Sequence, residues 1–99
     1  MAFYVYILYS RKLDKYYIGN TSLHPSERLE EHNTVRNPNA FTSKGIPWVL
    51  YYSIECESRV QARRIEAHIK RMKSKRYIQN LSVYPEIERR LLEKYADQG

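Results

Sequence analysis

Cysteine and long apolar runs are both scarce in this chain of 99 residues. The single cysteine, Cys56, excludes an internal disulfide and a zinc site made of several thiolates, and we expect it in the interior of a strand. The apolar stretch over residues 2–9 is too short to span a bilayer, and it has neither a basic leader nor a small-residue cleavage site. We therefore expect a cytoplasmic protein without a membrane partner.

Acidic residues are outnumbered, with 11 Asp and Glu against 17 Lys and Arg, which leaves a net charge of +6. A basic surface gains affinity for polyanions by displacing the counterions of their phosphates, so nucleic acid is the first partner to consider. Basicity that serves only solubility is the alternative. The chain also holds 10 tyrosines, which we expect mostly as half-buried residues of a sheet, because Tyr combines a large apolar body with a polar tip.

Three segments are rich in the β-branched and aromatic residues that favour strands. Residues 3–9 are predicted as a buried strand, with Phe3, Val5, Ile7 and Tyr9 on one face and Tyr4, Tyr6 and Leu8 on the other. A short polar connection and a second strand over 16–20 follow, which implies an antiparallel hairpin. Tyr6 and Tyr17 are then expected near each other on one face. A third strand covers 48–56, and its alternation predicts one face made of Trp48, Leu50, Tyr52, Ile54 and Cys56.

Other apolar residues recur at helical spacing. A first helix is predicted over 25–33, because Pro25 suits the first helical position, with Leu23 and Leu29 as its apolar contacts. Residues 33–47 are predicted as a long loop. Ser58 and Gln61 match a capping box, so a second helix begins there, with Glu66 on the flank of an apolar stripe predicted to comprise Ala62, Ile65, Ile69 and Met72.

A last amphipathic helix is predicted over residues 84–96, and no domain boundary, repeat or low-complexity segment interrupts the chain. The order β-β-α-β-α-α indicates the α+β fold class, with a small antiparallel sheet flanked by helices. We expect a single domain over residues 1–99, with its core over 3–80.

Several residues have side chains suited to phosphodiester hydrolysis, which needs a base, positive charge on the phosphate and usually a metal. Arg28 and His32 stand four apart, on one face of the first helix. Arg28 offers a planar fork that matches phosphate, and His32 is suited to proton transfer near neutral pH. Tyr6 or Tyr17 can act as a base if a cation lowers its pKa from about 10. Glu66 can hold a divalent cation.

Each of these residues also has a purely structural explanation. Both tyrosines can be packing residues, and His32 can cap the end of its helix, where the dipole favours a positive charge. Salt bridges along helix surfaces can explain the other charged residues: Arg28 with Glu27 or Glu31, and Glu66 with Arg63 or Lys70.

A resemblance to a known family rests on four motifs in order along the chain: Tyr4-Val5-Tyr6, Tyr17-Ile18-Gly19, Arg28-x-x-x-His32-Asn33, and Glu66 in a later helix. With these motifs, residues 3–80 resemble the GIY-YIG nuclease domain, most closely its small stand-alone bacterial subgroup. The resemblance implies a three-stranded antiparallel sheet flanked by helices. It also implies hydrolysis of DNA phosphodiester bonds with one divalent cation, Mg²⁺ or Mn²⁺.

The resemblance further implies a role for each matching residue. Tyr6 corresponds to the general base and Tyr17 to the residue that assists it. Arg28 corresponds to the residue that stabilises the phosphate, His32 to one that handles protons, and Glu66 to the metal ligand. Residues with an implied supporting role are Gly19, Asn33 and Asn80.

The first motif departs from the family pattern, because Tyr4 stands at the position of its glycine and Val5 replaces isoleucine. Tyr4 adds bulk near the start of the sheet. The tyrosine that would carry the chemistry, Tyr6, is retained, so activity remains compatible with the sequence.

We therefore expect a metal-dependent DNA endonuclease, of a kind used in DNA repair or recombination, with RNA open as a substrate. Nonspecific contacts to nucleic acid are expected from Lys44, Arg59, Arg63, Lys70, Lys73 and Lys75, although the first of these also fits a solvated turn. Two alternatives keep the same fold. One is a nucleic-acid-binding module without catalysis, and the other is an interaction protein whose C-terminal helix docks a protein partner.

Overall fold

Three strands form one antiparallel sheet in the order β2-β1-β3. The computed structural model describes residues 2–34 and 41–96. Its strands are β1 (Phe3–Ser10), β2 (Lys15–Thr21) and β3 (Trp48–Cys56), in the segments where aromatic and β-branched residues predict them. β1 is the central strand, and β2 is an edge strand joined to it by a hairpin. The expected three-stranded antiparallel sheet is confirmed.

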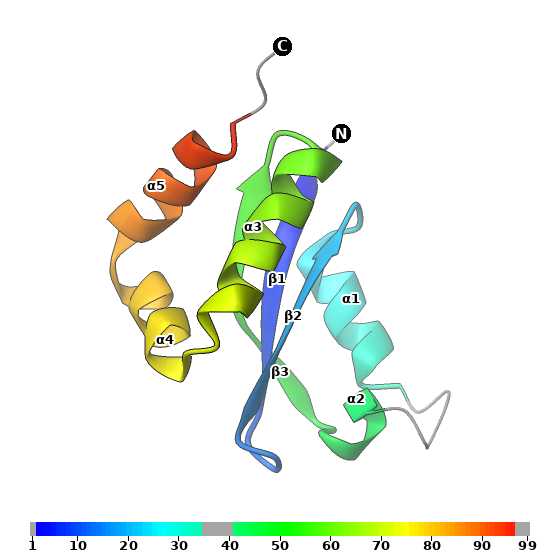
Figure 1. The fold of residues 1–99 in the computed structure, drawn as a ribbon. Coiled ribbons are helices and arrows are strands. Elements are labelled where there is room, and N and C mark those ends of the chain that lie inside the picture. The colour runs from blue at the N-terminus through cyan, green and yellow to red at the C-terminus, as the bar shows by residue number, and fades with distance from the viewer. Residues whose placement is uncertain (1, 35–40, 97–99) are drawn as a thin grey trace.

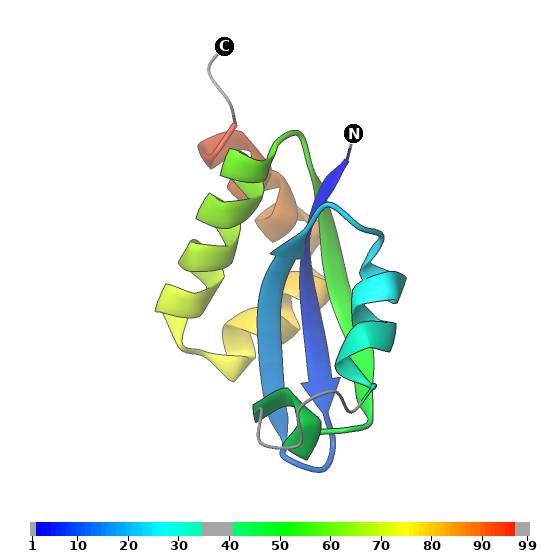
Figure 2. The ribbon, with the colours of Figure 1, turned by 90° about the vertical axis from the view of Figure 1, so that its right-hand side faces the viewer.

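Helices cover both faces of this sheet (Figures 1 and 2). One face carries α1 (Pro25–His32), and the other carries α3 (Arg59–Met72), α4 (Lys75–Val83) and α5 (Pro85–Lys94). The expected α+β class is confirmed, and the structure adds two short helices to the expected order. One of them, α2 (Phe41–Lys44), interrupts the segment predicted as a loop, so that prediction is wrong there; residues 35–40 lie outside the described residues.

In the described part of the chain, none of the helices combines the length and the apolar character needed to cross a bilayer.

The sheet separates two hydrophobic clusters, because successive residues of a strand point to opposite faces. Tyr6 and Leu8 of β1 are buried on the side of α1, where they pack with Trp48, and Leu29 lies against them. The cluster on the other face joins β1 and β3 to the three C-terminal helices through Val5, Ile7, Ile54, Cys56, Ala62, Ile65, Ile69, Ile78, Leu81 and Leu91. The alternation predicted for the first strand is therefore confirmed.

β3 changes face partway along its length, which the predicted alternation missed. Its pairing with β1 shifts in register between Ile7 and Leu8, which leaves Tyr51 as an extra residue in β3. Trp48 therefore joins the cluster on the α1 side, while Ile54, beyond the bulge, joins the opposite one. The single continuous face predicted for this strand is wrong for that reason.

Two apolar contacts predicted for the helices are also wrong. Leu23 is 43% exposed and Met72 is 45% exposed. Leu23 precedes His24, which caps α1, and the buried residue at the start of that helix is Pro25. Met72 is the last residue of α3, whose buried apolar stripe ends at Ile69.

α5 is part of the core, and Gln61 of α3 helps to hold it. The Gln61 side-chain amide donates a hydrogen bond to the carbonyl of Leu92 at 2.9 Å, and Leu91 is 4% exposed within the cluster. Ser58 caps α3 as predicted, but Gln61 accepts from the N–H of Glu57 at 2.7 Å and does not bond back to Ser58. Because the apolar side of α5 is occupied by its own domain, docking of a protein partner on that side is not supported.

We expect Leu91→Ala to lower the free energy of unfolding by about 2–5 kcal/mol, because it removes buried methyl groups and leaves a cavity. Urea denaturation of the full chain measures this. The matched control is Val83→Ala, at a position that is 65% exposed, for which we expect a change within about 0.5 kcal/mol. Equal and small effects of both substitutions would mean that α5 is not part of the core.

Candidate active site

The Tyr6 ring lies over the backbone of the edge strand. Tyr6, 1% exposed, is paired in the sheet with Gly19 of β2. A Cβ atom placed at Gly19 would lie 2.6 Å from the Tyr6 hydroxyl oxygen and 2.7 Å from Cζ. These distances are far below van der Waals contact, so any side chain at this position would collide with the ring. Gly19 is required for space, since its φ is not positive.

Tyr17 and His32 complete an aromatic group around Tyr6. Tyr17 is two residues before Gly19 and therefore faces the same side of the sheet, with its ring centroid 6.3 Å from that of Tyr6. The His32 ring centroid lies 4.7 Å from that of Tyr17, and His32 Nε2 lies 3.1 Å from the Tyr6 hydroxyl oxygen. The proximity of the two tyrosines predicted from the hairpin is confirmed.

Arg28 stands one helical turn before His32 and reaches the same group. Its guanidinium carbon lies 5.9 Å from the centroid of the Tyr6 ring. Its Nη1 donates to Glu31 at 2.6 Å, so one of the salt bridges considered from the sequence is present. Its Nε–H is buried and has no hydrogen-bond partner among the residues that the structure describes. A buried donor left unpaired costs about 1–3 kcal/mol, so an acceptor that reached this atom would be stabilised.

Asn33 fixes the C-terminal end of α1 to the sheet. Its side-chain amide donates to the carbonyl of Trp48 at 2.9 Å and accepts from the N–H of Trp48 at 2.6 Å. This pair of bonds joins α1 to the first residue of β3. Because His32 directly precedes Asn33, the pair also holds His32 close to Tyr6.

Glu66 approaches the edge strand from the opposite side, because α3 covers the other face of the sheet (Figure 2). Its Oε1 accepts from the side-chain amide of Asn20, the residue after Gly19, and its Oε2 accepts from Lys70 at 2.5 Å. The Glu66 side chain is 15% exposed, whereas that of Lys70 is 54% exposed. Among the charges that raise the pKa of Tyr6 is that of Glu66. The site therefore extends across Gly19 and Asn20, from one face of the sheet to the other.

Asn20 was not recognised from the sequence. It follows a motif glycine and resembles a turn residue, as Gly-Asn pairs commonly do. Its role could have been inferred only from its position one residue after Gly19. Because side chains alternate along a strand, that position directs the Asn20 side chain away from Tyr6 and toward α3.

The described ranges hold no group of three or more His, Cys, Asp or Glu side chains able to bind a metal, and the carboxylate beside Asn20 is that of Glu66. Mg²⁺ usually keeps several waters and takes one or two carboxylates together with substrate phosphates. A lone carboxylate beside the Asn20 amide fits that pattern. Both Glu66 oxygens already accept hydrogen bonds, so a cation here would replace the Lys70 ammonium group.

Burial controls the protonation of the central pair. Burial raises the pKa of Tyr6 above its ordinary value of 10, and the hydrogen bond and the positive charge of Arg28 only partly oppose this. Burial, together with the same Arg28 charge, lowers the pKa of His32 below 6.5. At neutral pH Tyr6 therefore carries its proton, and His32 is a neutral imidazole.

The other residues considered from the sequence lie outside this group. Asn80 lies in α4, and in the described part of the chain its side chain makes no hydrogen bond to the group, so its supporting role stays a prediction. Exposed basic residues lie on α2, along α3, directly after α3 and at the start of α4, in the order Lys44, Arg59, Arg63, Lys70, Lys73 and Lys75, and their contacts with nucleic acid stay a prediction.

Comparison with known families gives one match. The family model described as the GIY-YIG catalytic domain matches residues 2–80, most of the chain. No curated protein and no solved structure was found to match. The match confirms the resemblance inferred from the ordered motifs, and it covers all of the residues described above around Gly19.

We expect Gly19→Ala to lower the free energy of unfolding by about 1–3 kcal/mol, because the new methyl group collides with the Tyr6 ring. In a Tyr6→Ala background the same substitution meets no ring. It then becomes neutral or stabilising, since Ala is preferred to Gly inside a strand. A double-mutant cycle by urea denaturation measures the difference. Equal cost in both backgrounds would show that the ring does not lie over Gly19.

The lowered pKa of His32 makes stability depend on pH. Because the unfolded chain binds the His32 proton more readily than the folded one, the free energy of unfolding rises with pH up to about 6.5 and falls on acidification below it. We expect His32→Gln to reduce this loss of stability between neutral and mildly acidic pH. Denaturation curves of both proteins across that range provide the measurement, and identical pH slopes would contradict the burial of a neutral His32.

Proposed function

The chain belongs to the GIY-YIG family of nuclease domains, and we propose that it is a metal-dependent endonuclease that hydrolyses DNA phosphodiester bonds. The observation that carries this proposal is the buried Nε–H of Arg28, which has no acceptor among the described residues and belongs to the same group as the hydrogen-bonded Tyr6 and His32. An anion donor and a proton-transfer pair in one place are the parts that this hydrolysis requires.

Arg28 binds the scissile phosphate in this proposal. Its Nη1 already donates to Glu31. Its Nε–H, which has no partner among the described residues, can donate to an oxygen that approaches from another direction. A phosphate oxygen would satisfy the buried donor and place the positive charge where negative charge develops in the transition state. Glu31 holds the guanidinium in orientation, since its carboxylate fixes one end of the fork.

Tyr6 and His32 move the proton of the attacking water. With Tyr6 protonated and His32 neutral, we assign the Tyr6 hydroxyl as donor and His32 Nε2 as acceptor, with the His32 proton on Nδ1. As water attacks phosphorus, Tyr6 receives the proton of the water while it passes its own to Nε2. This relay removes the need for a free tyrosinate, which the raised pKa of Tyr6 disfavours. Tyr17 acts as a positioning residue, because its ring packs against His32.

Glu66, with the Asn20 amide beside it, would hold the divalent cation, Mg²⁺ or Mn²⁺. When bound, such a cation supplies positive charge to the phosphate oxygens and to the departing oxygen. Asn20 orients the Glu66 carboxylate by donating to one of its oxygens. Lys70 occupies the other oxygen and balances its charge when the cation is absent.

The departure at Tyr4 is compatible with catalysis. The Tyr4 side chain is directed to the end of the sheet, where its hydroxyl lies 3.4 Å from Glu55 and its ring centroid lies 5.9 Å from that of His24. The added bulk therefore lies near the start of α1 and is accommodated without displacing Tyr6.

A cleavage assay on labelled duplex, flap, branched and single-stranded DNA, with Mg²⁺, Mn²⁺ or EDTA, tests the proposal. We expect metal-dependent cleavage by the wild type. Tyr6→Phe should slow it by roughly 10²–10⁴-fold, because the proton relay is lost. Glu66→Gln should abolish the dependence on metal together with most of the activity.

The matched control for this assay is Glu30→Gln, which removes a carboxylate from the exposed side of α1 and should cleave like the wild type. Cleavage by Glu66→Gln at the wild-type rate would contradict the assigned metal ligand. Absence of cleavage on every DNA form, with binding retained in EDTA, would favour a nucleic-acid-binding module on the same fold.

A further inference from the structure

A cavity with a volume of about 360 Å³ lies between the three C-terminal helices. We call this cavity the helical pocket. It is lined by His68 of α3, Tyr77 of α4, and Ile87, Arg90, Leu91 and Lys94 of α5. Small-molecule sites usually have volumes of about 300–1,000 Å³, so the helical pocket is large enough to hold a ligand.

The helical pocket is separate from the proposed metal ligand. His68 stands two residues after Glu66, and two residues turn an α-helix by about 200°. The two side chains therefore leave α3 on opposite flanks, with Glu66 directed to Asn20 of β2 and His68 directed to Tyr95 at the end of α5. Because a helix with its side chains is about 10–12 Å wide, a ligand in the pocket does not touch Glu66.

Aromatic and aliphatic side chains form the walls of the helical pocket. The rings of His68 and Tyr77 have their centroids 6.0 Å apart. His68 Nδ1 lies 2.9 Å from the Tyr95 hydroxyl oxygen, and this hydrogen bond fixes the orientation of the imidazole. Leu91 belongs to the hydrophobic core, and Ile87 packs against it. The pocket therefore offers oriented rings and an apolar floor to a planar ligand.

The rim of the helical pocket is positively charged. Arg90 and Lys94 stand four residues apart on α5, so their side chains lie one turn apart on the same face. Neither forms an ion pair with any residue in the ranges that the structure describes, and no acidic residue lines the cavity. Lys94 Nζ lies 5.5 Å from the centroid of the Tyr95 ring, and Arg71 donates to the Tyr95 hydroxyl at 3.4 Å. Positive charges therefore gather at this rim without a carboxylate among the lining residues.

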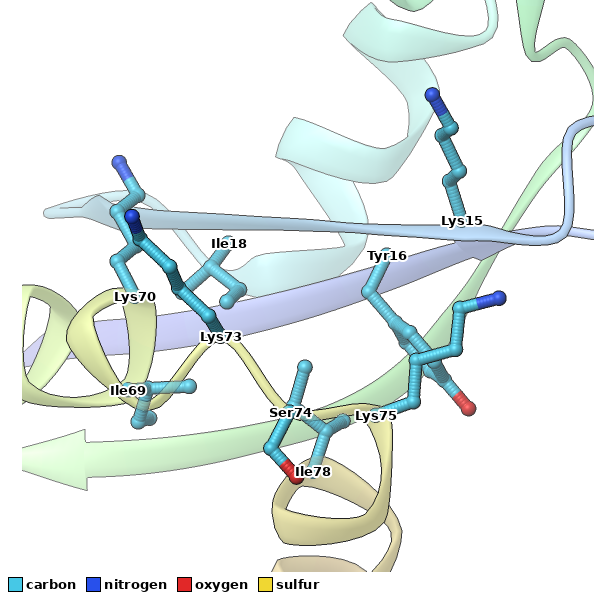
Figure 3. Close-up of a pocket in the computed structure, with 9 residues that line it drawn as sticks. All are labelled: Lys15, Tyr16, Ile18, Ile69, Lys70, Lys73, Ser74, Lys75 and Ile78. Atoms are coloured by element: carbon cyan, nitrogen blue, oxygen red, sulfur yellow. The ribbon is translucent and has the colours of Figure 1, made fainter.

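The cavity on the other flank of α3 differs in this respect (Figure 3). It has a volume of about 280 Å³, and Lys70, Lys73 and Lys75 are among its lining residues. Two of these lysines are paired with carboxylates, Lys70 with Glu66 and Lys75 with Asp14. Such carboxylates compete with an incoming anion. Because no acidic residue lines the helical pocket, it is the better site for an anionic ligand.

We propose that the helical pocket binds a nucleoside monophosphate. The base packs against the rings of Tyr77 and His68, and the phosphate contacts the guanidinium of Arg90 and the ammonium of Lys94. A phosphate monoester carries a charge of about −1.5 to −2 at neutral pH, which matches two cations, whereas a phosphate inside a strand carries about one negative charge. The ligand is therefore a free nucleotide or the phosphorylated end of a strand. The inference does not depend on the proposed cleavage.

Binding measurements in EDTA test this with the full chain, by isothermal titration calorimetry and by NMR. The probes are thymidine monophosphate, thymidine, inorganic phosphate, and oligodeoxythymidylates with and without a 5′-phosphate. The variant is Arg90→Gln/Lys94→Gln, which changes two exposed positions of α5 and keeps the walls of the pocket. The matched control is Arg11→Gln/Lys12→Gln, which removes the same charge from exposed positions of the hairpin.

We expect thymidine monophosphate to bind the wild type and the control with equal affinity. It should bind the pocket variant roughly 10–100-fold more weakly, because contacts to charged groups are lost. Thymidine and inorganic phosphate should each bind more weakly than the monophosphate, since each makes only part of the contacts. The backbone amide shifts caused by the monophosphate should cluster at His68, at Tyr77 and over residues 87–94.

The oligomers distinguish the two sources of the nucleotide. Binding of the 5′-phosphorylated oligomer that is tighter than that of the free monophosphate, and that weakens without the 5′-phosphate, would assign the pocket to the end of a strand. Tighter binding of the free monophosphate would assign it to a soluble nucleotide. Either result supports the proposed site.

Three results would overturn the inference. The first is equal affinity of the pocket variant and the control for thymidine monophosphate. The second is binding of inorganic phosphate as tight as that of the monophosphate, which would leave no role for the nucleoside. The third is a set of NMR shifts confined to the residues around Gly19, which would assign the nucleotide to the candidate active site. Because metal is absent throughout, failure of the proposed catalysis would leave these results unchanged, and failure of the pocket would leave cleavage in place.

Discussion

The close approach of the Tyr6 ring to the Gly19 backbone determines where the candidate site can exist. Tyr6 stands on the central strand, and its hydroxyl reaches the edge of the sheet only because Gly19 leaves the space free. From that edge α1 brings His32 and Arg28 to the hydroxyl on one face, and α3 brings Glu66 to the adjacent residue on the other. With a side chain at Gly19, Tyr6 would be one more packed aromatic residue, and the groups on the two faces would have no common position.

The parts of the fold that were predicted correctly are those in which the sequence of one short segment determines its secondary structure and its buried face. The alternation of β1 and the helical spacing of Ala62, Ile65 and Ile69 each follow from one segment of chain. The bulge at Tyr51 does not, because it arises from pairing between β1 and β3, which are distant in sequence. The same holds within the site. The order of the motifs indicated Tyr6, Arg28 and Glu66 as site residues. The contact between Asn20 and Glu66 could not be predicted in this way, because it depends on the packing of α3 against β2.

Internal pairing of charge recurs around the edge strand. Glu66 is largely buried and would be costly to leave alone, and Lys70 and Asn20 together compensate for it. The charge of Arg28 is compensated in the same way by Glu31. Nη1 of Arg28 donates to the Glu31 carboxylate, whereas its Nε–H has no hydrogen-bond partner among the described residues. Arg28 and Glu66 are therefore each paired within the folded chain, but each pair includes a member that is partly exposed and can exchange its partner. Such an arrangement keeps the free protein stable while its charged groups remain available to ligands.

The edge strand β2 carries two sets of residues at alternate positions, one directed to each side of the sheet. Single replacements within β2 alter one set and leave the other intact. Insertion or deletion of one residue, in contrast, exchanges the two sets: Gly19 leaves its place under the Tyr6 ring, and Asn20 turns away from Glu66. We therefore expect natural length variation in related chains to accumulate in the hairpin at residues 11–14 and to be absent from β2, even where its side chains differ.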